Sequence, residues 1–329
     1  MTNRATLLIC LLLLLPLAAQ AATDTKPAAN RAANNRNDAC GLLTTTEVEA
    51  VLGPLAGPPF QAVRARPQPN REECRYETAG FRAISVKVLW TDGAQMIGMM
   101  EAVQGVVKKA GLAELKLTEG TTVAGAWDEA RVSQCCEFNA LRGDQLVTIN
   151  IAGSRVTLQQ AARLADAAVK RLDQPLAIAG EDGIKAAQER FLLRPKRRSV
   201  CDLLTRADAE AITRVALSAP PKGDEKSCAY TWPLDANSTY TIELDVTWLD
   251  GFETMRTIQS VVGNTSAMIG LGKPSNAGKL EAGPWDELAQ SIIGVMAVKN
   301  DVMVSIESGP FEADTSRSFV KKAIENLAR

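Results

Sequence analysis

Apolar and polar residues alternate with a period of two in matching stretches of the two halves of the chain. Such alternation is typical of a β-strand that buries one face. The apolar positions are Ile84, Val86, Val88 and Trp90 in residues 81–91, and Ile242, Leu244, Val246 and Trp248 further along. We therefore predict equivalent strands in the two halves, with residues 72–78 as the other arm of the first hairpin.

Helix signals flank these strands. Thr44 and Glu47 stand at capping-box spacing ahead of a stop at Gly53, and Thr205 and Asp208 repeat that start. Each half closes on an apolar stripe of helical period, which runs through Ala161, Leu164, Ala165, Ala168, Val169 and Leu172 in the first and Phe319, Val320, Ala323, Ile324 and Leu327 in the second. These patterns predict a short helix at the start of each half and an amphipathic helix at its end.

The predicted order in each half is helix, two strands, helix, three strands, helix. In the first half the last three strands are expected in residues 127–133, 138–141 and 146–151, with a turn at 142–144. Short links favour antiparallel pairing, and one apolar face per element favours a sheet covered by helices. The predicted fold class is α+β, a tandem duplication of an antiparallel-sheet domain covered by helices.

Uncommon residues recur in the same order, which supports the duplication. The matched sets are Cys40, Leu42, Leu43, Thr44 with Cys201, Leu203, Leu204, Thr205; Cys74, Tyr76 with Cys228, Tyr230; Trp90, Asp92, Gly93 with Trp248, Asp250, Gly251; and Gly125, Trp127, Asp128, Glu129 with Gly283, Trp285, Asp286, Glu287. Cys40 and Cys201 lie 161 residues apart, Cys74 and Cys228 154, and Trp127 and Trp285 158. This near-constant spacing predicts two copies of one domain, which suits a chain of 329 residues.

The chain begins with the features of an export signal. Arg4 precedes a short apolar run, and Ala19 and Ala21 fit a cleavage site. The run is shorter than the roughly 20 residues of a transmembrane helix, and Cys10 does not stand where a lipoprotein cysteine would. We expect a periplasmic or secreted protein with no transmembrane segment. The predicted segments are a signal peptide at 1–21, a disordered spacer at 22–38, repeat domains at 39–173 and 200–329, and a linker at 174–199.

If the protein is exported, its cysteines are expected to form structural disulfides, because thiols in an oxidising compartment tend to pair. The duplication selects two disulfides, Cys40 with Cys74 and Cys201 with Cys228. In the loop-entropy model each bridge would stabilise its repeat by about 3 to 4 kcal/mol.

Cys135 and Cys136 have no counterparts in the second repeat. A local disulfide between them is one reading and pairing with another chain is a second, because a bond between strand neighbours needs a distorted turn. A vicinal redox or metal site is the alternative, although neither a Cys-x-x-Cys spacing nor an activating environment is visible.

Two further patterns receive structural readings. The side chains of Asp92 and Asp250, each followed by glycine, are expected to cap the helices that follow them. The basic run at residues 194–198 is expected to be a solvated part of the linker.

The Cys-x-Leu-Leu-Thr start of each repeat, with its later Cys-x-Tyr, resembles a group of small exported actinobacterial lipoproteins of unknown function. The resemblance covers roughly the first 40 residues of each repeat. The order of strands and helices is also similar to the α-β-α sandwich of PsbP and Mog1. That resemblance implies a non-catalytic accessory role.

The composition offers little catalytic chemistry. The chain has no histidine, so a Ser-His or Cys-His pair is excluded. Its net charge of −1 argues against nucleic-acid binding. The Gly-x-Trp-Asp-Glu motifs form a candidate binding surface of Trp127, Asp128, Glu129, Trp285, Asp286 and Glu287. Their paired acids suit acid–base work or a cation, although too few ligands are in view for either, and a core tryptophan beside solvated acids is the structural reading.

We therefore predict an exported two-domain binding or accessory protein of the cell envelope, without catalytic residues, metal or cofactor, that binds a protein, peptide or envelope ligand. The alternative is a thiol-redox or carboxylate-based enzyme that uses Cys135 and Cys136 or the Trp-Asp-Glu motifs.

Overall fold

The structure of the chain is a computed structural model that describes residues 38–62, 70–109, 118–133, 136–174, 176, 183–235, 237–268, 283–291, 294–307, 309 and 311–327. The predicted signal peptide, the spacer up to residue 37 and Cys135 lie outside the described residues. Asp38, expected at the end of the disordered spacer, instead caps the first turn, because its carboxylate accepts a hydrogen bond from the Cys40 N–H at 2.9 Å.

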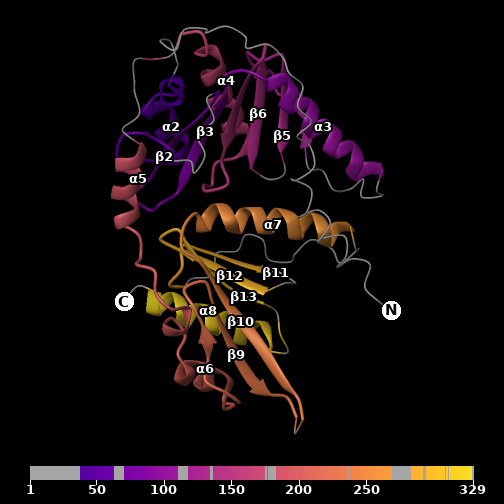
Figure 1. Ribbon diagram of the computed structural model, residues 1–329. Coiled ribbons are helices and arrows are strands. Elements are labelled where there is room, and N and C mark those ends of the chain that lie inside the picture. Colours follow the sequence, from indigo (N-terminus) through magenta and orange to yellow (C-terminus); the bar gives the residue numbers. More distant parts are fainter. Residues whose placement is uncertain are drawn as a thin grey trace, which may run out of the picture. The chain divides into compact units, whose positions relative to one another are not determined.

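The first repeat forms a seven-stranded antiparallel sheet in the order β1-β2-β3-β7-β6-β5-β4 (Figure 1). Its elements are the 3₁₀ turn η1 (Ala39–Leu42), α2 (Thr45–Leu52), β1 (Phe60–Gln61), β2 (Arg71–Glu77), β3 (Ala83–Leu89), α3 (Gly93–Lys109), β4 (Thr118–Gly120), β5 (Glu129–Ser133), β6 (Glu137–Arg142), β7 (Gln145–Asn150) and α4 (Leu158–Lys170). Helix α5 (Gly183–Leu192) follows it.

The second repeat forms a six-stranded antiparallel sheet in the order β11-β12-β13-β10-β9-β8. Its elements are η2 (Val200–Asp202), α6 (Arg206–Thr213), β8 (Lys222–Gly223), β9 (Ser227–Pro233), β10 (Thr239–Thr247), α7 (Gly251–Met268), β11 (Glu287–Ser291), β12 (Gly294–Lys299), β13 (Val302–Glu307) and α8 (Ala313–Leu327).

The central strands confirm the predicted α+β class and its duplication. Strands β2, β3, β7, β6 and β5 occupy the same order as β9, β10, β13, β12 and β11. The cross-strand register also repeats, since Tyr76 faces Ile84 in one copy and Tyr230 faces Ile242 in the other. The short strands β1, β4 and β8 were not predicted, because two or three residues carry no readable alternation.

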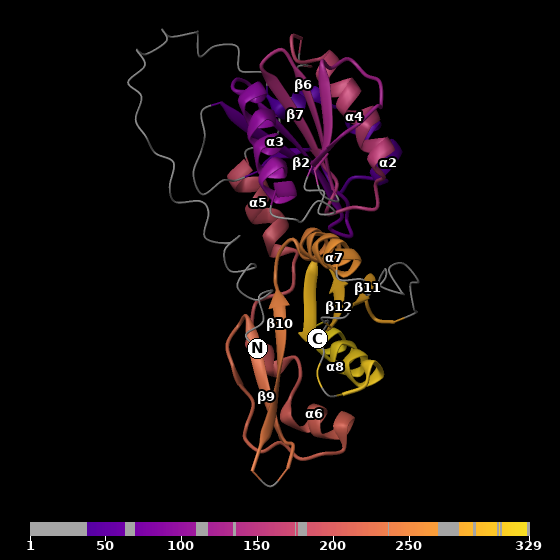
Figure 2. The same cartoon turned by 90° about the vertical axis from the view of Figure 1, so that its right-hand side faces the viewer.

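Each sheet carries a helix on both faces, as Figures 1 and 2 show. The main core of each repeat lies under its last helix, where α4 packs on the first sheet and α8 on the second. On the opposite faces α3 covers a small cluster around Ile97, whereas α7 covers a larger one that includes Phe252 and Met255. None of the described helices has the length and apolar character needed to cross a bilayer.

The predicted capping boxes are present and tie the first helix of each repeat to the last. Thr44 and Glu47 exchange hydrogen bonds at the start of α2, as Thr205 and Asp208 do at the start of α6. The same Glu47 carboxylate accepts two hydrogen bonds from Arg171 at 2.7 and 2.8 Å. In the second repeat Lys322 pairs with Asp208 at 3.2 Å.

The two predicted disulfides are present. Cys40 bonds to Cys74 and Cys201 to Cys228, with Cα–Cα distances of 5.0 and 5.2 Å. The tyrosine two residues after each second cysteine donates its hydroxyl to the first turn: Tyr76 to the carbonyls of Cys40 and Leu43, and Tyr230 to that of Leu204. Burial raises the pKa of both phenols, so they remain donors. The Cys-x-Leu-Leu-Thr motif therefore supplies a disulfide cysteine, two leucines and the threonine that caps the next helix.

The predicted capping role of Asp92 and Asp250 is wrong. Both residues have positive φ, and in each repeat the hairpin-turn aspartate accepts from the helix start instead. Asp144 Oδ2 accepts from the Asp92 N–H at 2.9 Å, and Asp301 Oδ2 from the Asp250 N–H at 3.2 Å. The following glycine is required because a Cβ on Gly93 or Gly251 would meet the backbone of that turn at 2.8 or 2.6 Å.

Candidate functional site

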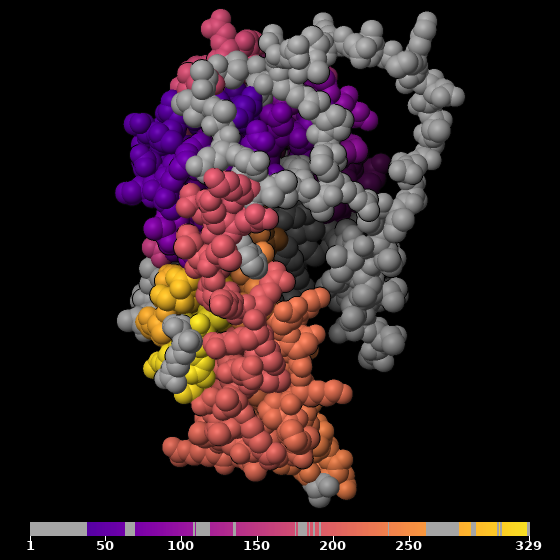
Figure 3. All heavy atoms as spheres, turned by 60° about the vertical axis from the view of Figure 1, so that its left-hand side comes forward, coloured from indigo at the N-terminus to yellow at the C-terminus, as the bar shows by residue number. Residues whose placement is uncertain are grey.

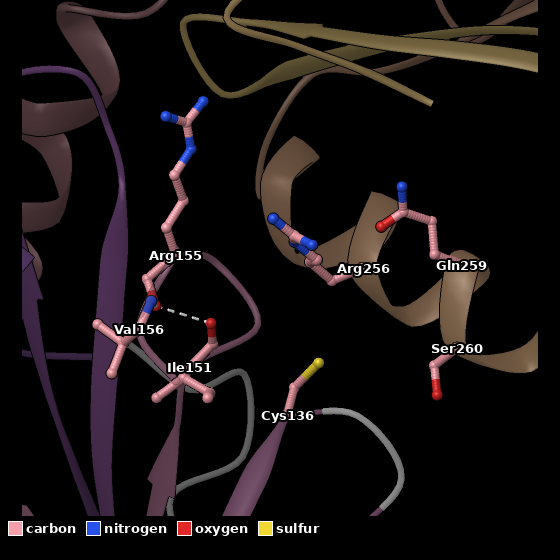
Figure 4. Close-up of a pocket in the computed structure, with 8 residues that line it drawn as sticks. Cys136, Ile151, Arg155, Val156, Arg256, Gln259 and Ser260 are labelled. Atoms are coloured by element: carbon pink, nitrogen blue, oxygen red, sulfur yellow. Dashed lines mark hydrogen bonds between the residues drawn. The ribbon is translucent and has the colours of Figure 1, made fainter. Parts of the chain in front are cut away.

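A cavity of about 300 Å³ lies between the repeats. Its first-repeat wall consists of Cys136, Ile151, Ser154, Arg155 and Val156, and its second-repeat wall of Arg256, Gln259 and Ser260 (Figure 4). Pockets for small ligands have volumes from about 300 to 1,000 Å³. The cavity is thus large enough for a small molecule.

Apart from Cys136, which directly precedes β6, the first-repeat wall is a hydrogen-bonded loop between β7 and α4. The Ile151 N–H donates to the Cys136 carbonyl at 2.8 Å, and the Ser154 hydroxyl donates to the Ile151 carbonyl at 2.8 Å. The Val156 N–H in turn donates to the Ser154 hydroxyl at 3.2 Å. These bonds fix the backbone on both sides of Arg155, whose side chain is exposed.

The second-repeat wall is one face of α7, because Arg256, Gln259 and Ser260 are three and four positions apart. The start of α7 is held by Asp301, whose Oδ1 accepts from the Phe252 N–H at 3.3 Å. Figure 4 shows Arg256 and Ser260 on α7 across from the loop that carries Arg155.

Three arginines gather at one side of the cavity. Glu287 pairs with Arg256 at 2.7 Å and with Arg82 at 3.4 Å, while Arg155 Nη2 donates to the Asp286 carbonyl at 3.3 Å. Arg82 also lies over the Phe252 ring, 4.3 Å from its centroid. Burial lowers the pKa of Arg82, and the charges of Arg155 and Arg256 lower it further, against the opposing effect of Glu287. We call Arg82, Arg155 and Arg256 the arginine cluster.

A buried ion network joins the repeats beside this cluster. Arg194, between α5 and η2, pairs with Glu77 of the first repeat and Asp301 of the second, each at 3.1 Å. Arg75 pairs with Asp250 at 3.1 Å and with Glu77 at 3.2 Å. Burial raises the pKa of Asp301 in spite of the two arginines. The neighbouring carboxylates outweigh burial at Arg75 and raise its pKa.

The basic run is therefore not the solvated linker that was predicted. The Arg194 side chain is 8% exposed, and Arg198 donates to the Asn326 carbonyl, although Lys196 and Arg197 are exposed. Figure 3 shows the red spheres of α5 and of the residues that follow it lying against both the indigo first repeat and the orange second repeat. Arg194 and Arg198 are held because they meet two carboxylates and a backbone carbonyl of the repeats, whereas Lys196 and Arg197 face solvent as predicted.

The Gly-x-Trp-Asp-Glu motifs hold the hairpin turns. Asp128 accepts from the Gly143 N–H at 2.7 Å, and Asp286 from the Asn300 N–H at 2.8 Å. A Cβ on Gly125 or Gly283 would lie 2.2 or 2.3 Å from the ring of the next motif residue, Trp127 or Trp285. Trp127 packs on Phe138 at 5.2 Å between ring centroids, and Trp285 is 9% exposed.

The two motif glutamates differ. Glu129 accepts from Arg131 Nε at 2.6 Å within its own repeat, whereas Glu287 reaches Arg82 of the other repeat. Of the six residues predicted as a binding surface, Asp286 through its carbonyl and Glu287 through its carboxylate thus contact the arginine cluster. Asp128 holds a turn of the first repeat and Glu129 begins β5, while Trp127 and Trp285 pack on the cores of their own repeats.

Cys136 is disulfide-bonded and lines the cavity, with 8% of its surface exposed. Cys135 lies outside the described residues, so a bond between the two neighbours stays a prediction. Among the residues that the structure describes, no group of three or more histidine, cysteine or acidic side chains is placed to hold a metal ion.

Sequence reasoning missed the arginine cluster because the duplication does not repeat it. The spacing of 158 between Gly93 and Gly251 places Gly98 opposite Arg256. Only the docking of the repeats brings these arginines together.

No family model, curated protein or solved structure matches the chain.

Proposed function

We propose that the chain is an exported, non-enzymatic binding or accessory protein of the cell envelope whose ligand occupies the cavity between the repeats. The observation that carries this proposal is that both repeats contribute side chains to one cavity, with guanidinium, amide and hydroxyl groups beside the apolar Ile151 and Val156. Convergent polar groups on a partly apolar wall are typical of small-molecule sites.

Two further features support the proposal. The motif carboxylates Asp128 and Asp286 hold turn N–H groups, which speaks against a carboxylate-based enzyme. The two disulfides support a periplasmic or secreted location, because such bonds persist in oxidising compartments.

The test is a ligand-observed NMR screen of small fragments against the wild-type protein and Ser260→Trp, which fills the cavity from α7. A matched control is Gln159→Trp on the exposed face of α4. We expect fragments that bind the wild type and Gln159→Trp and that lose binding to Ser260→Trp. Fragments that bind all three proteins equally would contradict the proposal.

A second candidate function is thiol–disulfide exchange, favoured by the position of Cys136 in the lining of a cavity that Arg155 and Arg256 also line. Nearby guanidinium groups stabilise a thiolate. A substrate dithiol would pass two electrons to the Cys136 disulfide, leaving two thiols on the protein and a disulfide on the substrate. Thiol titration of the folded oxidised protein under mild reductant would show reversible two-electron reduction at Cys136. Inert cysteines would support the non-enzymatic function.

A further inference from the structure

The composition of the cavity wall indicates the charge of its ligand. We infer that the cavity takes a small anion, with a carboxylate or phosphate group held by Arg155 and Arg256. This inference rests on the proposed binding function and adds the chemical class of the ligand.

Arg155 has no carboxylate partner among the described residues. Its guanidinium group donates to a neutral acceptor, the Asp286 carbonyl, at 3.3 Å. The Asp286 carboxylate pairs with Lys299 at 2.9 Å, and the Glu287 carboxylate pairs with Arg82 and Arg256. An anion in the cavity would therefore give Arg155 a charged acceptor.

Arg155 and Arg256 also repel a third guanidinium group, that of Arg82, which does not line the cavity. Burial lowers the pKa of Arg82, and the charges of Arg155 and Arg256 lower it further, against the opposing effect of Glu287. An anion would relieve this repulsion, because guanidinium groups bind carboxylate and phosphate oxygens through paired N–H donors.

Arg155 is exposed at the cavity edge, and its bond to a carbonyl is readily exchanged for a stronger one to a charged oxygen. Gln259 and Ser260 add neutral donors from α7 on the opposite wall. An anion between the loop and α7 would thus meet donors from both repeats.

The test uses citrate and inorganic phosphate as anionic probes and glucose as an uncharged probe. The melting temperature of the full exported chain is measured against probe concentration at constant ionic strength, for the wild type, Arg155→Gln and Arg256→Gln. The control is Arg163→Gln, which removes an exposed arginine from α4 of the first repeat, away from the cavity wall.

We expect citrate or phosphate to raise the melting temperature of the wild type and of Arg163→Gln. We expect each cavity variant to weaken the apparent affinity about tenfold or more, since a hydrogen bond to a charged group is lost. Arg256→Gln also removes the ion pair with Glu287 and can lower the melting temperature without ligand. The effect of each probe on this variant is therefore measured relative to the melting temperature of the same variant without probe. Arg155→Gln tests the same cavity at an exposed position.

Three outcomes would overturn the inference. The first is that neither anion stabilises the wild type. The second is equal stabilisation of Arg155→Gln and Arg163→Gln. The third is that glucose binds as well as citrate and that Ser260→Trp abolishes its binding. This result would agree with the proposed binding function and would reject only the claim that the ligand is an anion. Fragment binding that is insensitive to Ser260→Trp would instead reject the binding function itself.

Discussion

Asp144 and Asp301 occupy equivalent positions in the two repeats, but only Asp301 also contacts the other repeat and the segment between the repeats. Both accept hydrogen bonds from the start of the neighbouring helix, α3 or α7. Asp144 is exposed, whereas Asp301 is 1% exposed and also pairs with Arg194. The duplicated aspartate therefore stabilises the turn and helix start of each copy, and its surroundings in the second copy also make it part of the junction.

Helices α3 and α7 show the same contrast. Helix α7 carries Arg256 and Ser260 into the cavity, while α3 presents Met99, Val103 and Val106 to solvent. The arrangement is head-to-tail: the second repeat presents its turn and α7 to the first, and the first presents the strand residues Arg75 and Glu77.

The largest predicted effect is one that the two repeats share. Replacing both cysteines of a disulfide by alanine should lower the free energy of unfolding by about 4 kcal/mol in either repeat, because the cysteines are 34 and 27 residues apart and the loop-entropy cost varies slowly with length. Urea denaturation of the two double variants measures it. A loss of unfolding free energy in only one of the two double variants would show that the two disulfides do not contribute equally.

The next effect should differ between the two repeats. Asp301→Ala should cost about 3 kcal/mol or more, because it removes a partner from Arg194 in a buried ion network. Asp144→Ala should cost about 1 kcal/mol, the usual value of a lost helix cap. Urea denaturation of both variants provides the comparison, and equal costs would mean that burial of Asp301 adds nothing.

A smaller effect should again be common to both copies. Tyr76→Phe and Tyr230→Phe should each cost about 1 kcal/mol, because each removes a buried hydroxyl that bonds to the first turn of its repeat. Thermal unfolding of the two variants checks this. If Tyr230→Phe were neutral while Tyr76→Phe was costly, the shared role of the motif would be refuted.

The smallest effect depends on pH and belongs to the second repeat. Burial, with the charges of Glu243 and Glu307, raises the pKa of Asp245 to about 6. A carboxyl group with a raised pKa favours folding below its unfolded value, and this contribution is lost as pH rises through about 6. Asp245→Asn should therefore stabilise the protein more at pH 8 than at pH 4, both values lying roughly two units from the raised pKa. Melting temperatures at both values test it, and a pH-independent difference would contradict it.

The sequence predicted what depends on local pattern and on duplication. The disulfides, the Thr44 and Thr205 caps and the order of the central strands follow from residues that recur at fixed spacing. The true cap of α3 was missed because Asp144 lies on a hairpin about fifty residues away and reaches Asp92 only once the sheet packs.

The cavity was missed for a related reason. Arg155 and Arg256 come from different repeats, and Gly98, the counterpart of Arg256, shares neither its charge nor its size. Arg194 was read as solvated because its acids, Glu77 and Asp301, lie 117 and 107 residues away. Contacts between the two repeats produce no periodic pattern in the sequence, so residues that make them cannot be recognised by periodicity.

The most direct test of the account is a double-mutant cycle between Arg194→Ala and Asp301→Ala, with Arg194→Ala and Asp144→Ala as the matched cycle in the first repeat. Unfolding free energies of the single and double variants give the coupling energy. The account predicts coupling of about 1 to 3 kcal/mol for Arg194 with Asp301 and none for Arg194 with Asp144. Additive costs in the first cycle would contradict the claim that Asp301 joins the two copies.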